Sequence, residues 1–352
     1  MRLLKHLLGV AVTAAPPTSA AALGAELGGN SPSLLKEGML VSGPVLGQAR
    51  RKLSHARRRE PIRCGAGEGF RKEFGAFPPT RLQKGAMAIG RRLPRNYFGR
   101  RVSGFLRSLL RRVGDQPVDL EVLGVRMRIH LDNNACERRL LVTPHFFDPA
   151  ELEILKSRIK PGFRFVDLGA NVGAYSLFVA RRAGRKARIL AIEPQPEILE
   201  RLKTNIALNG FSIDVAPVAI LEKEGEAELV VDSRNLGHTL VSREPKGQVG
   251  RRLLRVPAAT LLQLVQSRGY SRIDCLKADI EGAEDRALMP FFSTAPRSLW
   301  PRLMILEHSP REWQIDLIGA LRGLGYRLIG PARANVVLEL VDGRDQPPSK
   351  QH

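Results

Sequence analysis

Apolar and polar residues follow different patterns on the two sides of residue 97. The first 96 residues are rich in Ala, Gly, Pro, Ser and Arg with little sustained apolar spacing, so we expect a largely disordered basic leader there. From residue 97 onwards, apolar residues recur at spacings of three and four between arginines, which predicts a basic amphipathic helix over residues 97–114. Its apolar positions are Phe98, Val102, Phe105, Leu106, Leu109, Leu110 and Val113.

The apolar stripe of this helix has two interpretations. It could cap the domain that follows, which is the commoner fate of such a stripe and the one that we prefer. Alternatively, residues 97–113 could make a weak contact with an anionic membrane surface.

Residues 115–341 alternate between strand-like and helix-like segments, which is typical of a parallel sheet with crossover helices. After a hairpin over 118–131, the predicted strands cover 163–168, 188–192, 213–218, 227–231, 253–256, 273–278, 303–306, 326–329 and 336–341. The predicted helices cover 174–183, 198–208, 261–266, 283–292 and 313–324. This order predicts an α/β fold with a doubly wound, Rossmann-like sheet, followed by a tail over residues 342–352.

Composition and charge narrow the class of protein. The chain has 352 residues, of which 43% are hydrophobic, and carries 56 Lys+Arg against 35 Asp+Glu, a net charge of +21. Residues 1–114 hold 22 basic and 5 acidic residues, a net of +17, which leaves 34 against 30, or +4, for residues 115–352. A nucleic-acid enzyme would carry its positive charge on the folded domain, so we expect no nucleic-acid partner.

The cysteines and the apolar runs bear on the compartment. Cys64, Cys136 and Cys275 lie far apart without a C-x-x-C pattern, so we expect neither a disulfide framework nor a cysteine zinc site, and a reducing, cytoplasmic location is the default. The longest apolar run, residues 3–15, is interrupted by charged and polar residues, which disfavours a membrane span. Residues 1–25 resemble a weak secretory signal or transit peptide, but we prefer an unstructured or overlong leader.

A glycine-bearing turn follows the first predicted core strand. The stretch runs Phe165, Val166, Asp167, Leu168, Gly169, Ala170, Asn171, Val172 and Gly173. Glycines here let the backbone approach a ligand closely, and the free N–H groups of the next helix favour a polar or anionic group. The spacing predicts a nucleotide-type pocket. Asn171 stands where a dinucleotide motif has its second glycine, which disfavours a nicotinamide oxidoreductase, and the chain has no P-loop sequence.

An acidic residue ends the second predicted core strand. Glu193 precedes Pro194 and lies 26 positions after Asp167, where folds of this kind bind ribose hydroxyls. A carboxylate can accept hydrogen bonds from two hydroxyls at once. By itself such a Glu would more often be a solvated helix start, but beside the glycine turn we prefer the ligand-binding interpretation.

Three carboxylates crowd the end of the strand predicted at 273–278. Asp279, Glu281 and Glu284 fall within six residues, with Lys277 just before them. Placing them together is unfavourable unless a ligand, a cation or the lysine offsets their charge. Alternatively, Glu281 and Glu284 only complement the positive end of a helix dipole.

Together these motifs resemble the FkbM family of S-adenosylmethionine-dependent methyltransferases. The resemblance is carried by residues 167–173, 193–194, 205–210, 218–219, 277–284 and 306–308, and it covers residues 115–341. It implies a class I methyltransferase fold, with a seven-stranded sheet whose last strand is antiparallel, and S-adenosylmethionine as the cofactor. The implied cofactor-binding residues are Asp167, Gly169, Asn171, Gly173 and Glu193.

The resemblance further implies O-methylation of a hydroxylated small molecule or glycan: a sugar, a lipid-linked glycan or a secondary metabolite. The acceptor hydroxyl must lose its proton, so a general base or a metal is expected. The candidates are Asp279 and Glu281, as base or as ligands of a divalent cation, and His308, which follows Glu307 at a strand end. His238 could line the acceptor side, although a loop histidine is more often only solvated.

Two other functions stay open. A nucleic-acid methyltransferase is disfavoured because enzymes that methylate base amino groups usually have an Asn-Pro-Pro-aromatic sequence where this chain has residues 279–282. A non-catalytic module that keeps only the cofactor fold is disfavoured by the retained carboxylates at Asp279, Glu281 and Glu284.

Overall fold

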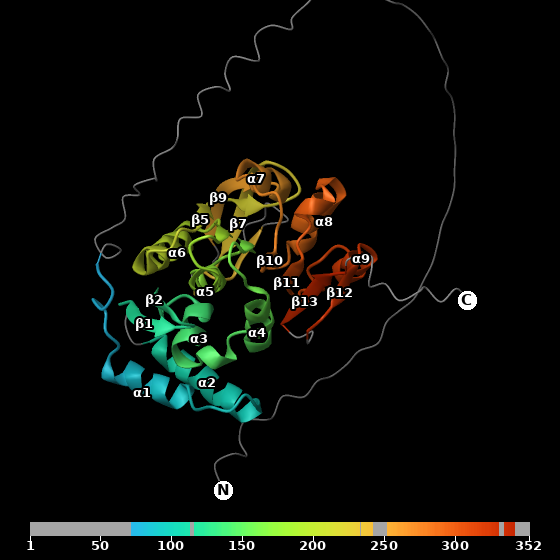
Figure 1. Cartoon of the computed structure of the whole chain (residues 1–352). Helices are drawn as coiled ribbons and strands as arrows, with labels where there is room; N and C mark the ends of the chain where they lie inside the picture. Colours follow the sequence, from blue (N-terminus) through green and yellow to red (C-terminus); the bar gives the residue numbers. More distant parts are fainter. Residues whose placement is uncertain (1–71, 113–115, 233, 242–251, 331–333, 342–352) are drawn as a thin grey trace, which may run out of the picture. The chain divides into compact units, whose positions relative to one another are not determined.

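A computed structural model describes residues 72–112, 116–232, 234–241, 252–330 and 334–341 (Figure 1). Most of the predicted leader and the whole predicted tail, residues 342–352, lie outside the described residues. None of the described helices is both long enough and apolar enough to cross a membrane.

A seven-stranded sheet forms the centre of the described part of the chain. Its strands, in spatial order, are β12 (Tyr326–Leu328), β13 (Asn335–Leu340), β11 (Leu303–Glu307), β10 (Cys275–Ala278), β3 (Arg164–Leu168), β4 (Arg188–Ile192) and β5 (Asp214–Ala216). Neighbouring strands are parallel except at β13, which is antiparallel to both β11 and β12. The predicted doubly wound sheet with an antiparallel last strand is therefore confirmed.

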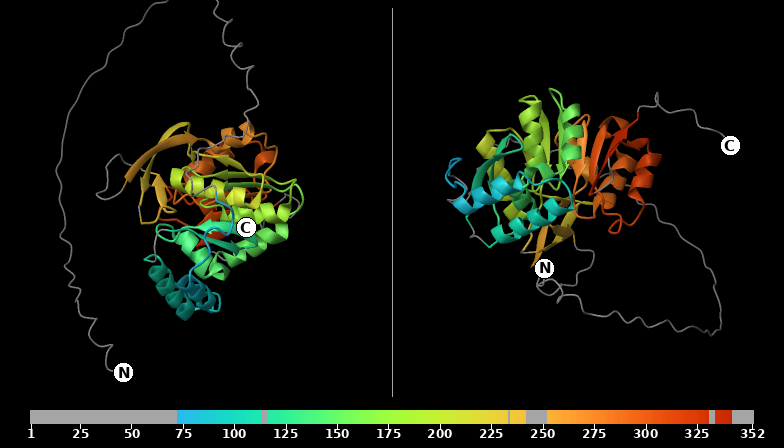
Figure 2. Two further views of the ribbon diagram at one scale, coloured as in Figure 1. Left: turned by 90° about the vertical axis from the view of Figure 1, so that its left-hand side faces the viewer. Right: turned by 90° about the horizontal axis from the view of Figure 1, so that it is seen from below.

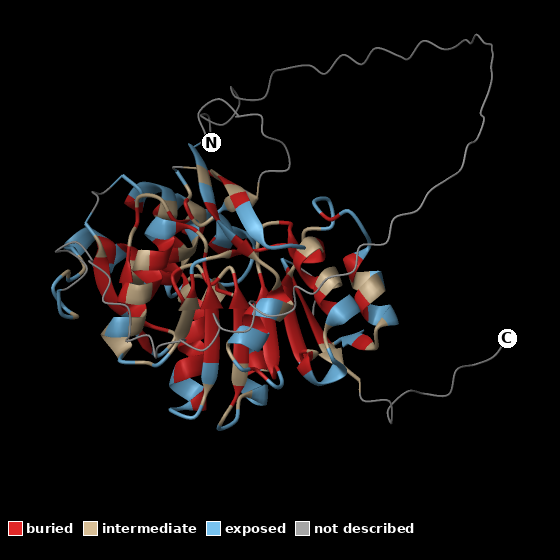
Figure 3. Ribbon diagram, turned by 90° about the horizontal axis from the view of Figure 1, so that it is seen from above, coloured by how far each residue is buried: buried red, intermediate tan, exposed pale blue. Residues whose placement is uncertain are grey.

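Helices cover both faces of this sheet. One face packs against α4 (Pro149–Arg158), α5 (Ala174–Ala183) and α6 (Pro196–Asn209), and the other against α7 (Leu261–Ser267), α8 (Glu284–Thr294) and α9 (Leu317–Gly323). Phe165 and Val166 of β3 are both fully buried although they point to opposite faces. Strands covered on both faces read as continuous apolar runs, which is why the sequence predicted them well. Figure 3 shows the central strands buried along their length.

Two smaller sheets flank the core. The predicted hairpin is observed as β1 (Val118–Val122) and β2 (Val125–Ile129), joined through Leu123 and Gly124 at positive φ. A four-stranded sheet contains β6 (Ala219–Ile220), β9 (Arg252–Ala259), β7 (Gly225–Val231) and β8 (Thr239–Val241) in that order. This second sheet forms a wall beside the carboxyl edge of the central strands.

The prediction that residues 1–96 form a largely disordered leader is wrong for residues 72–96. They contain α1 (Arg81–Gly90), which begins at a capping box formed by Thr80 and Gln83. The helix packs through small residues: a Cβ on Gly90 would lie 2.2 Å from the carbonyl oxygen of Val142. Because close packing through glycine and alanine leaves no large apolar stripe, the hydrophobic pattern did not reveal it.

The predicted basic helix is observed as α2 (Tyr97–Leu110). Its buried side chains Ser103, Leu106 and Leu110 face the body of the domain, and α2 contacts both α1 and α3 (Ala135–Val142). In this respect α2 does cap the following domain. Other apolar residues of the predicted stripe, including Phe98 and Phe105, stay exposed.

Several local features were not predicted. Helices α3 and α4 and two short 3-10 segments, Pro144–Phe146 and Arg297–Leu299, had no clear signal in the sequence. The helix predicted from residue 313 begins only at Leu317, because the Asp316 side chain accepts a hydrogen bond from the Gly319 N–H and so caps it there. Trp313 instead donates its indole N–H to Glu284 at 2.8 Å.

A buried ion pair fixes the segment before α1 to the hairpin. Asp119 accepts two hydrogen bonds from the Arg128 guanidinium, at 2.8 and 3.0 Å, and both side chains are almost fully buried. The same carboxylate accepts the N–H groups of Gly75 and Phe77. Removing one member of such a pair leaves an uncompensated buried charge, which is strongly destabilising.

We therefore expect Asp119→Ala to lower the free energy of unfolding by about 3–5 kcal/mol, measured by denaturant titration. The matched control is Glu121→Ala on the same strand, because Glu121 is exposed and only pairs with exposed Arg126 at 3.7 Å. Its effect should stay within about 0.5 kcal/mol. Equal effects of the two substitutions would show that residues 72–77 are not held by Asp119.

Candidate active site

The register of the parallel strands brings separate parts of the sequence to one edge of the sheet. Leu168 of β3 pairs with Ala278 of β10 and with Ile192 of β4, and Ala278 pairs in turn with Leu306 of β11. The residues that follow these positions therefore emerge side by side at the carboxyl ends of the strands, where open α/β sheets bind ligands. They are Gly169, Glu193, Asp279 and Glu307.

The turn after β3 depends on a very close backbone contact. Gly169 has φ +71°, and a Cβ at this position would lie 1.9 Å from the carbonyl oxygen of Asp279. Only glycine is compatible with both conditions. Gly173, at φ +92°, begins α5, where a Cβ would lie 2.7 Å from Leu202. Both glycines are thus required by the packing of the turn itself, against the end of β10 and against α6.

Asn171 occupies the left-handed region at φ +49° in the middle of this turn. Its side-chain oxygen accepts hydrogen bonds from its neighbour Val172 N–H and from the Asn134 amide, at 2.9 and 2.8 Å. Asparagine tolerates this conformation because a short polar side chain can bond locally. Asn171 therefore supplies at this position the left-handed backbone conformation that glycine adopts most readily.

Glu193 lies beside the turn and lines the cavity. Its two carboxylate oxygens accept the backbone N–H groups of Asn171 and Gln195, each at 2.9 Å. Burial raises the pKa of Glu193 to about 7, although these two hydrogen bonds oppose the shift. Each oxygen keeps a free lone pair, so the carboxylate can still accept ligand hydroxyls.

Asp167 lies beneath the site rather than in its wall. The side chain is fully buried, accepts the Ser176 hydroxyl at 2.6 Å, and is outside the cavity lining, as is Gly173. Its second oxygen lies 3.6 Å from the ammonium nitrogen of Lys277. Burial raises the pKa of Asp167 while Lys277 lowers it. Asp167 therefore does not contact the cavity itself but helps to hold the Lys277 ammonium, which does.

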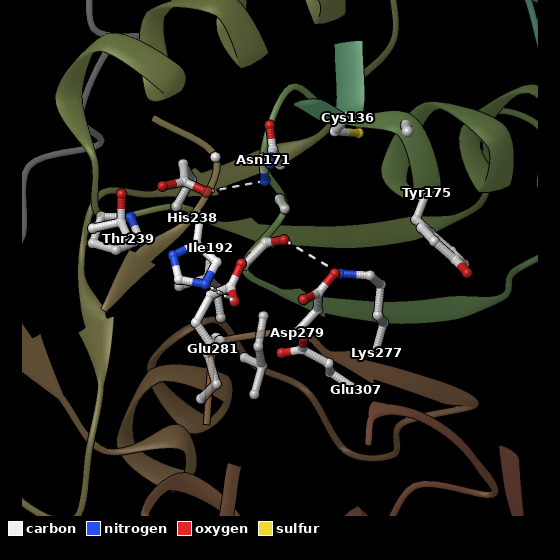
Figure 4. Close-up of a pocket in the computed structure, with 18 of the residues that line it drawn as sticks. Cys136, Asn171, Tyr175, Ile192, His238, Thr239, Lys277, Asp279, Glu281 and Glu307 are labelled. Carbon is white, nitrogen blue, oxygen red and sulfur yellow. Dashed lines mark hydrogen bonds and ion pairs between the residues drawn. The ribbon is translucent and has the colours of Figure 1, made fainter. Parts of the chain in front are cut away.

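Lys277 connects the buried and accessible parts of the site (Figure 4). Its ammonium lies 3.2 Å from the Asp279 carboxylate and donates to the Gly169 carbonyl at 3.3 Å. Burial lowers the pKa of Lys277, but Asp279 and Asp167 outweigh that effect and raise it overall. The lysine is therefore charged throughout the physiological range.

The carboxyl groups of Asp279, Glu281 and Glu307 gather on one side of the cavity (Figure 4). Burial, with the neighbouring Glu307 and Asp279 charges, raises the pKa of Glu281 to about 9. Burial, with Asp279 and Glu284, raises the pKa of Glu307 to about 7. Glu281 and Glu307 therefore hold their protons to a higher pH than free carboxyl groups do.

The predicted histidines have different positions. His238 lines the cavity, and its Nε2 lies 3.3 Å from a Glu281 carboxylate oxygen. His308 is outside the cavity lining, and its ring stands edge-on to Trp313 with the ring centroids 5.9 Å apart. The residue before it, Glu307, lines the cavity instead, with one buried oxygen that has no hydrogen-bond partner.

Other cavity residues were missed by the sequence patterns. Tyr175 donates its hydroxyl to Asp148 at 3.0 Å, and both side chains line the cavity together with Asn134 and Arg139. Asp148 directly precedes the proline that starts α4, and Tyr175 lies in the first turn after Gly173. Their places next to the starts of α4 and α5 are the sequence features that could have indicated Asp148 and Tyr175 as cavity residues.

The cavity measures about 300 Å³, which is at the small end of the range for small-molecule sites. Five acidic residues line it against two basic ones, Arg139 and Lys277. The acidic residues are Asp148, Glu193, Asp279, Glu281 and Glu307. Such a lining favours a cationic or neutral ligand with hydroxyl groups and disfavours a phosphate-rich one.

The predicted divalent cation gains no support. Among the described residues, no group of three or more His, Cys, Asp or Glu side chains is arranged to hold a metal ion. Lys277 already compensates the charge of Asp279, the carboxylate that would be the first candidate ligand.

Comparison with known proteins identifies related sequences. Residues 167–328 match the family model described as the methyltransferase FkbM domain, which confirms the resemblance seen in the sequence. The chain is 30% identical over 173 residues to methyltransferase sdnD of Sordaria araneosa, over 41% of this chain and 63% of that protein. It is 35% identical over 68 residues to the AMB antimetabolite synthetase AmbE of Pseudomonas aeruginosa, over 19% of this chain and 3% of that protein.

The chain therefore spans less than two thirds of the length of these curated relatives. Among solved structures, a SAM-dependent methyltransferase from Agrobacterium tumefaciens matches with a TM-score of 0.36 at 14% identity. That match covers 63% of this chain and 69% of the other.

The raised pKa of Glu281 predicts a pH dependence of stability. Its ordinary value is 4.5 and its value in the folded protein is about 9, so between these limits the folded state holds a proton that the unfolded state has released. The stability this gives is present below pH 4.5 and is lost as the pH rises through 9. We expect Glu281→Gln, which cannot ionise, to gain melting temperature relative to the unmodified protein as the pH rises across this window.

Thermal melts at several pH values check this expectation. Glu226→Gln, an exposed position on β7, is the control and should show no pH-dependent difference. A constant offset between Glu281→Gln and the unmodified protein at all pH values would contradict the prediction.

Proposed function

We propose that this chain, whose residues 167–328 form an FkbM methyltransferase domain, transfers a methyl group from S-adenosylmethionine to a hydroxyl oxygen. The observation that carries the proposal is the row formed by the Gly169 turn, Glu193 and Asp279 at the carboxyl edge of the sheet. One part of this row suits an adenosine-bearing ligand and the other suits a reacting hydroxyl.

The Glu193 side of the cavity is suited to the nucleoside of the cofactor. Its carboxylate can accept the two ribose hydroxyls, while its bonds to Asn171 N–H and Gln195 N–H hold it in one orientation. The missing side chain at Gly169 lets the turn pack directly against the Asp279 carbonyl, which keeps Asp279 close to the turn. Asn171 and Glu193 both line the cavity, whereas Asp167 supports them from below.

The acidic lining is suited to a cationic donor. S-adenosylmethionine carries a sulfonium and an ammonium group, and both are attracted by carboxylates in a partly desolvated cavity. The positive charge of the sulfonium is lost when the methyl group is transferred, so the same carboxylates hold the donor more tightly than the neutral thioether product. A polyanionic acceptor such as nucleic acid would be repelled by this lining.

The carboxylates at the mouth of the cavity are suited to deprotonation of the acceptor. The acceptor oxygen forms a bond to the methyl carbon as the carbon–sulfur bond breaks, and its proton passes to a carboxylate. We assign this role to Asp279, with Glu281 and Glu307 beside it at the cavity. Asp279 is the most accessible of the three, with 41% of its side chain exposed, and Lys277 fixes its position.

The acceptor is proposed to be a neutral, hydroxylated molecule such as a sugar, a lipid-linked glycan or a secondary metabolite. Tyr175, Asp148 and His238 line the cavity and offer hydrogen bonds to such hydroxyls. The reaction needs the acceptor oxygen in line with the methyl group, so these contacts would act mainly by orientation.

Cofactor binding is tested with Glu193→Ala. Loss of two hydrogen bonds to a charged group should weaken the binding of S-adenosylhomocysteine about 100-fold in calorimetric titration. Glu226→Ala, at an exposed position outside the cavity lining, is the control and should bind as the unmodified protein does. Unchanged affinity in a folded Glu193→Ala variant would remove Glu193 from the cofactor site.

Proton transfer is tested with Asp279→Asn. The change keeps the size of the side chain, so S-adenosylhomocysteine affinity should be retained while turnover falls about 100-fold or more. Turnover is followed as S-adenosylhomocysteine release with glycan and lipid extracts as acceptors. Asp214→Asn is the matched control, because Asp214 is equally exposed and also paired with a cation, Arg268, but lies outside the cavity lining. Full activity of Asp279→Asn would dismiss Asp279 as the base.

A further inference from the structure

Helices α1 and α2 expose large apolar side chains that the fold does not use. On α2, Tyr97 is 73% exposed, Phe98 66% and Phe105 68%, with Leu109 partly exposed. On α1, Leu82 and Ile89 are also exposed and lie seven residues apart, on one side of the helix. We call this set of residues the apolar patch. Exposed aromatic side chains at this density are typical of interaction sites.

The helical spacing of α2 separates this patch from the face that packs on the domain. Gly99, Ser103, Leu106 and Leu110 recur at spacings of four, three and four, and all four are buried. Phe98, Phe105 and Leu109 form an exposed stripe displaced from these four by one residue, and Val102, at the same displacement, is half-buried against the core. One residue corresponds to a rotation of about 100° around the helix axis. The exposed stripe is therefore an additional apolar surface and not a frayed part of the core.

Basic residues surround the patch without acidic neighbours in the sequence. Residues 81–112 contain ten basic residues and no Asp or Glu. The basic residues are Arg81, Lys84, Arg91, Arg92, Arg95, Arg100, Arg101, Arg107, Arg111 and Arg112. On α2, Arg101 lies one turn before Phe105, and Arg112 lies in the turn directly after the helix. Apolar and cationic side chains thus share the exposed side of this helix pair.

We propose that α1 and α2 form a docking surface for an anionic lipid membrane, with the apolar patch in the interface and the surrounding arginines on lipid headgroups. An interfacial helix combines an apolar face with a basic polar face in this way. Residues 1–71 are poor occupants of the patch because they carry 11 basic and 4 acidic residues, and a second copy of the patch would bring the same positive charge. An anionic surface complements both the charge and the apolar stripe.

The position of the helix pair supports this assignment. α1 and α2 lie on the side of the domain opposite to α9 and β12 (Figure 2). Both contact α3, whose first turn, including Cys136, lines the cavity. The proposed surface is therefore separate from the residues of the site, so its variants leave the cavity intact.

The test uses the full chain and flotation with two kinds of vesicle, one of phosphatidylcholine alone and one of an equimolar mixture with phosphatidylglycerol. We expect binding to the mixed vesicles only, weakened by high sodium chloride. The triple variant Phe98→Ser, Phe105→Ser, Leu109→Ser should bind the mixed vesicles at least about tenfold more weakly than the unmodified chain. The matched control, Ile315→Ser with Leu328→Ser, removes apolar side chains that are 44% and 41% exposed elsewhere on the domain and should bind normally.

A second variant, Arg101→Gln with Arg112→Gln, removes charge without any apolar change and should also weaken binding to the mixed vesicles. It keeps the proposal testable if the triple variant folds poorly, which is monitored by S-adenosylhomocysteine affinity and thermal melts. The proposal would be overturned if the unmodified chain did not bind vesicles, or if both variants bound the mixed vesicles as well as the unmodified chain does. So would a dimer, detected by light scattering, that the triple variant converts to a monomer without any vesicle binding. None of these results depends on whether the chain methylates a hydroxyl.

Discussion

The ammonium of Lys277 holds the two carboxylates and the backbone turn on which the site depends. It lies between buried Asp167 and accessible Asp279, and it donates to the Gly169 carbonyl. The ends of two neighbouring strands, β3 and β10, are thereby held together by one cation. Without it, Asp167 would keep only the Ser176 hydroxyl, and an ionised carboxylate in that position would be strongly unfavourable.

This arrangement separates a structural acid from reactive ones. Asp167 is fully buried outside the cavity lining, and burial raises its pKa although the Lys277 ammonium 3.6 Å away opposes that shift. Glu193, Glu281 and Glu307 lie at the cavity and are not fully compensated, which is why burial raises the pKa of each. The negative charge of these three carboxyl groups is therefore only partly compensated at the place where a cationic ligand can enter. This is expected for a binding site and not for a structural ion-pair network.

The sequence predicted those parts of the site that follow from parallel strand ends. Gly169, Glu193 and Asp279 immediately follow buried apolar strands, and the register of the sheet brings them together. Whether a residue at a strand end points into the cavity or behind it depends on packing that the local sequence does not encode. For this reason the sequence indicated Asp167 as a cofactor-binding residue, although it lies outside the cavity lining. It also indicated His308 as a candidate base, although the neighbouring Glu307 is the residue that lines the cavity. Helix α1 escaped notice because it packs through small residues, and α3 and α4 because their apolar faces are short.

Helix α3 is shared between the proposed lipid-docking surface and the cavity. Its first turn carries Asn134 at its cap and Cys136 in the cavity wall, and its body packs on α1 and α2. A protein bound through α1 and α2 would keep its cavity at a fixed tilt and height above the bilayer. An acceptor in the same lipid leaflet would then reach the cavity by diffusion in two dimensions. An acceptor whose reactive hydroxyl lies deep in the bilayer would not reach it.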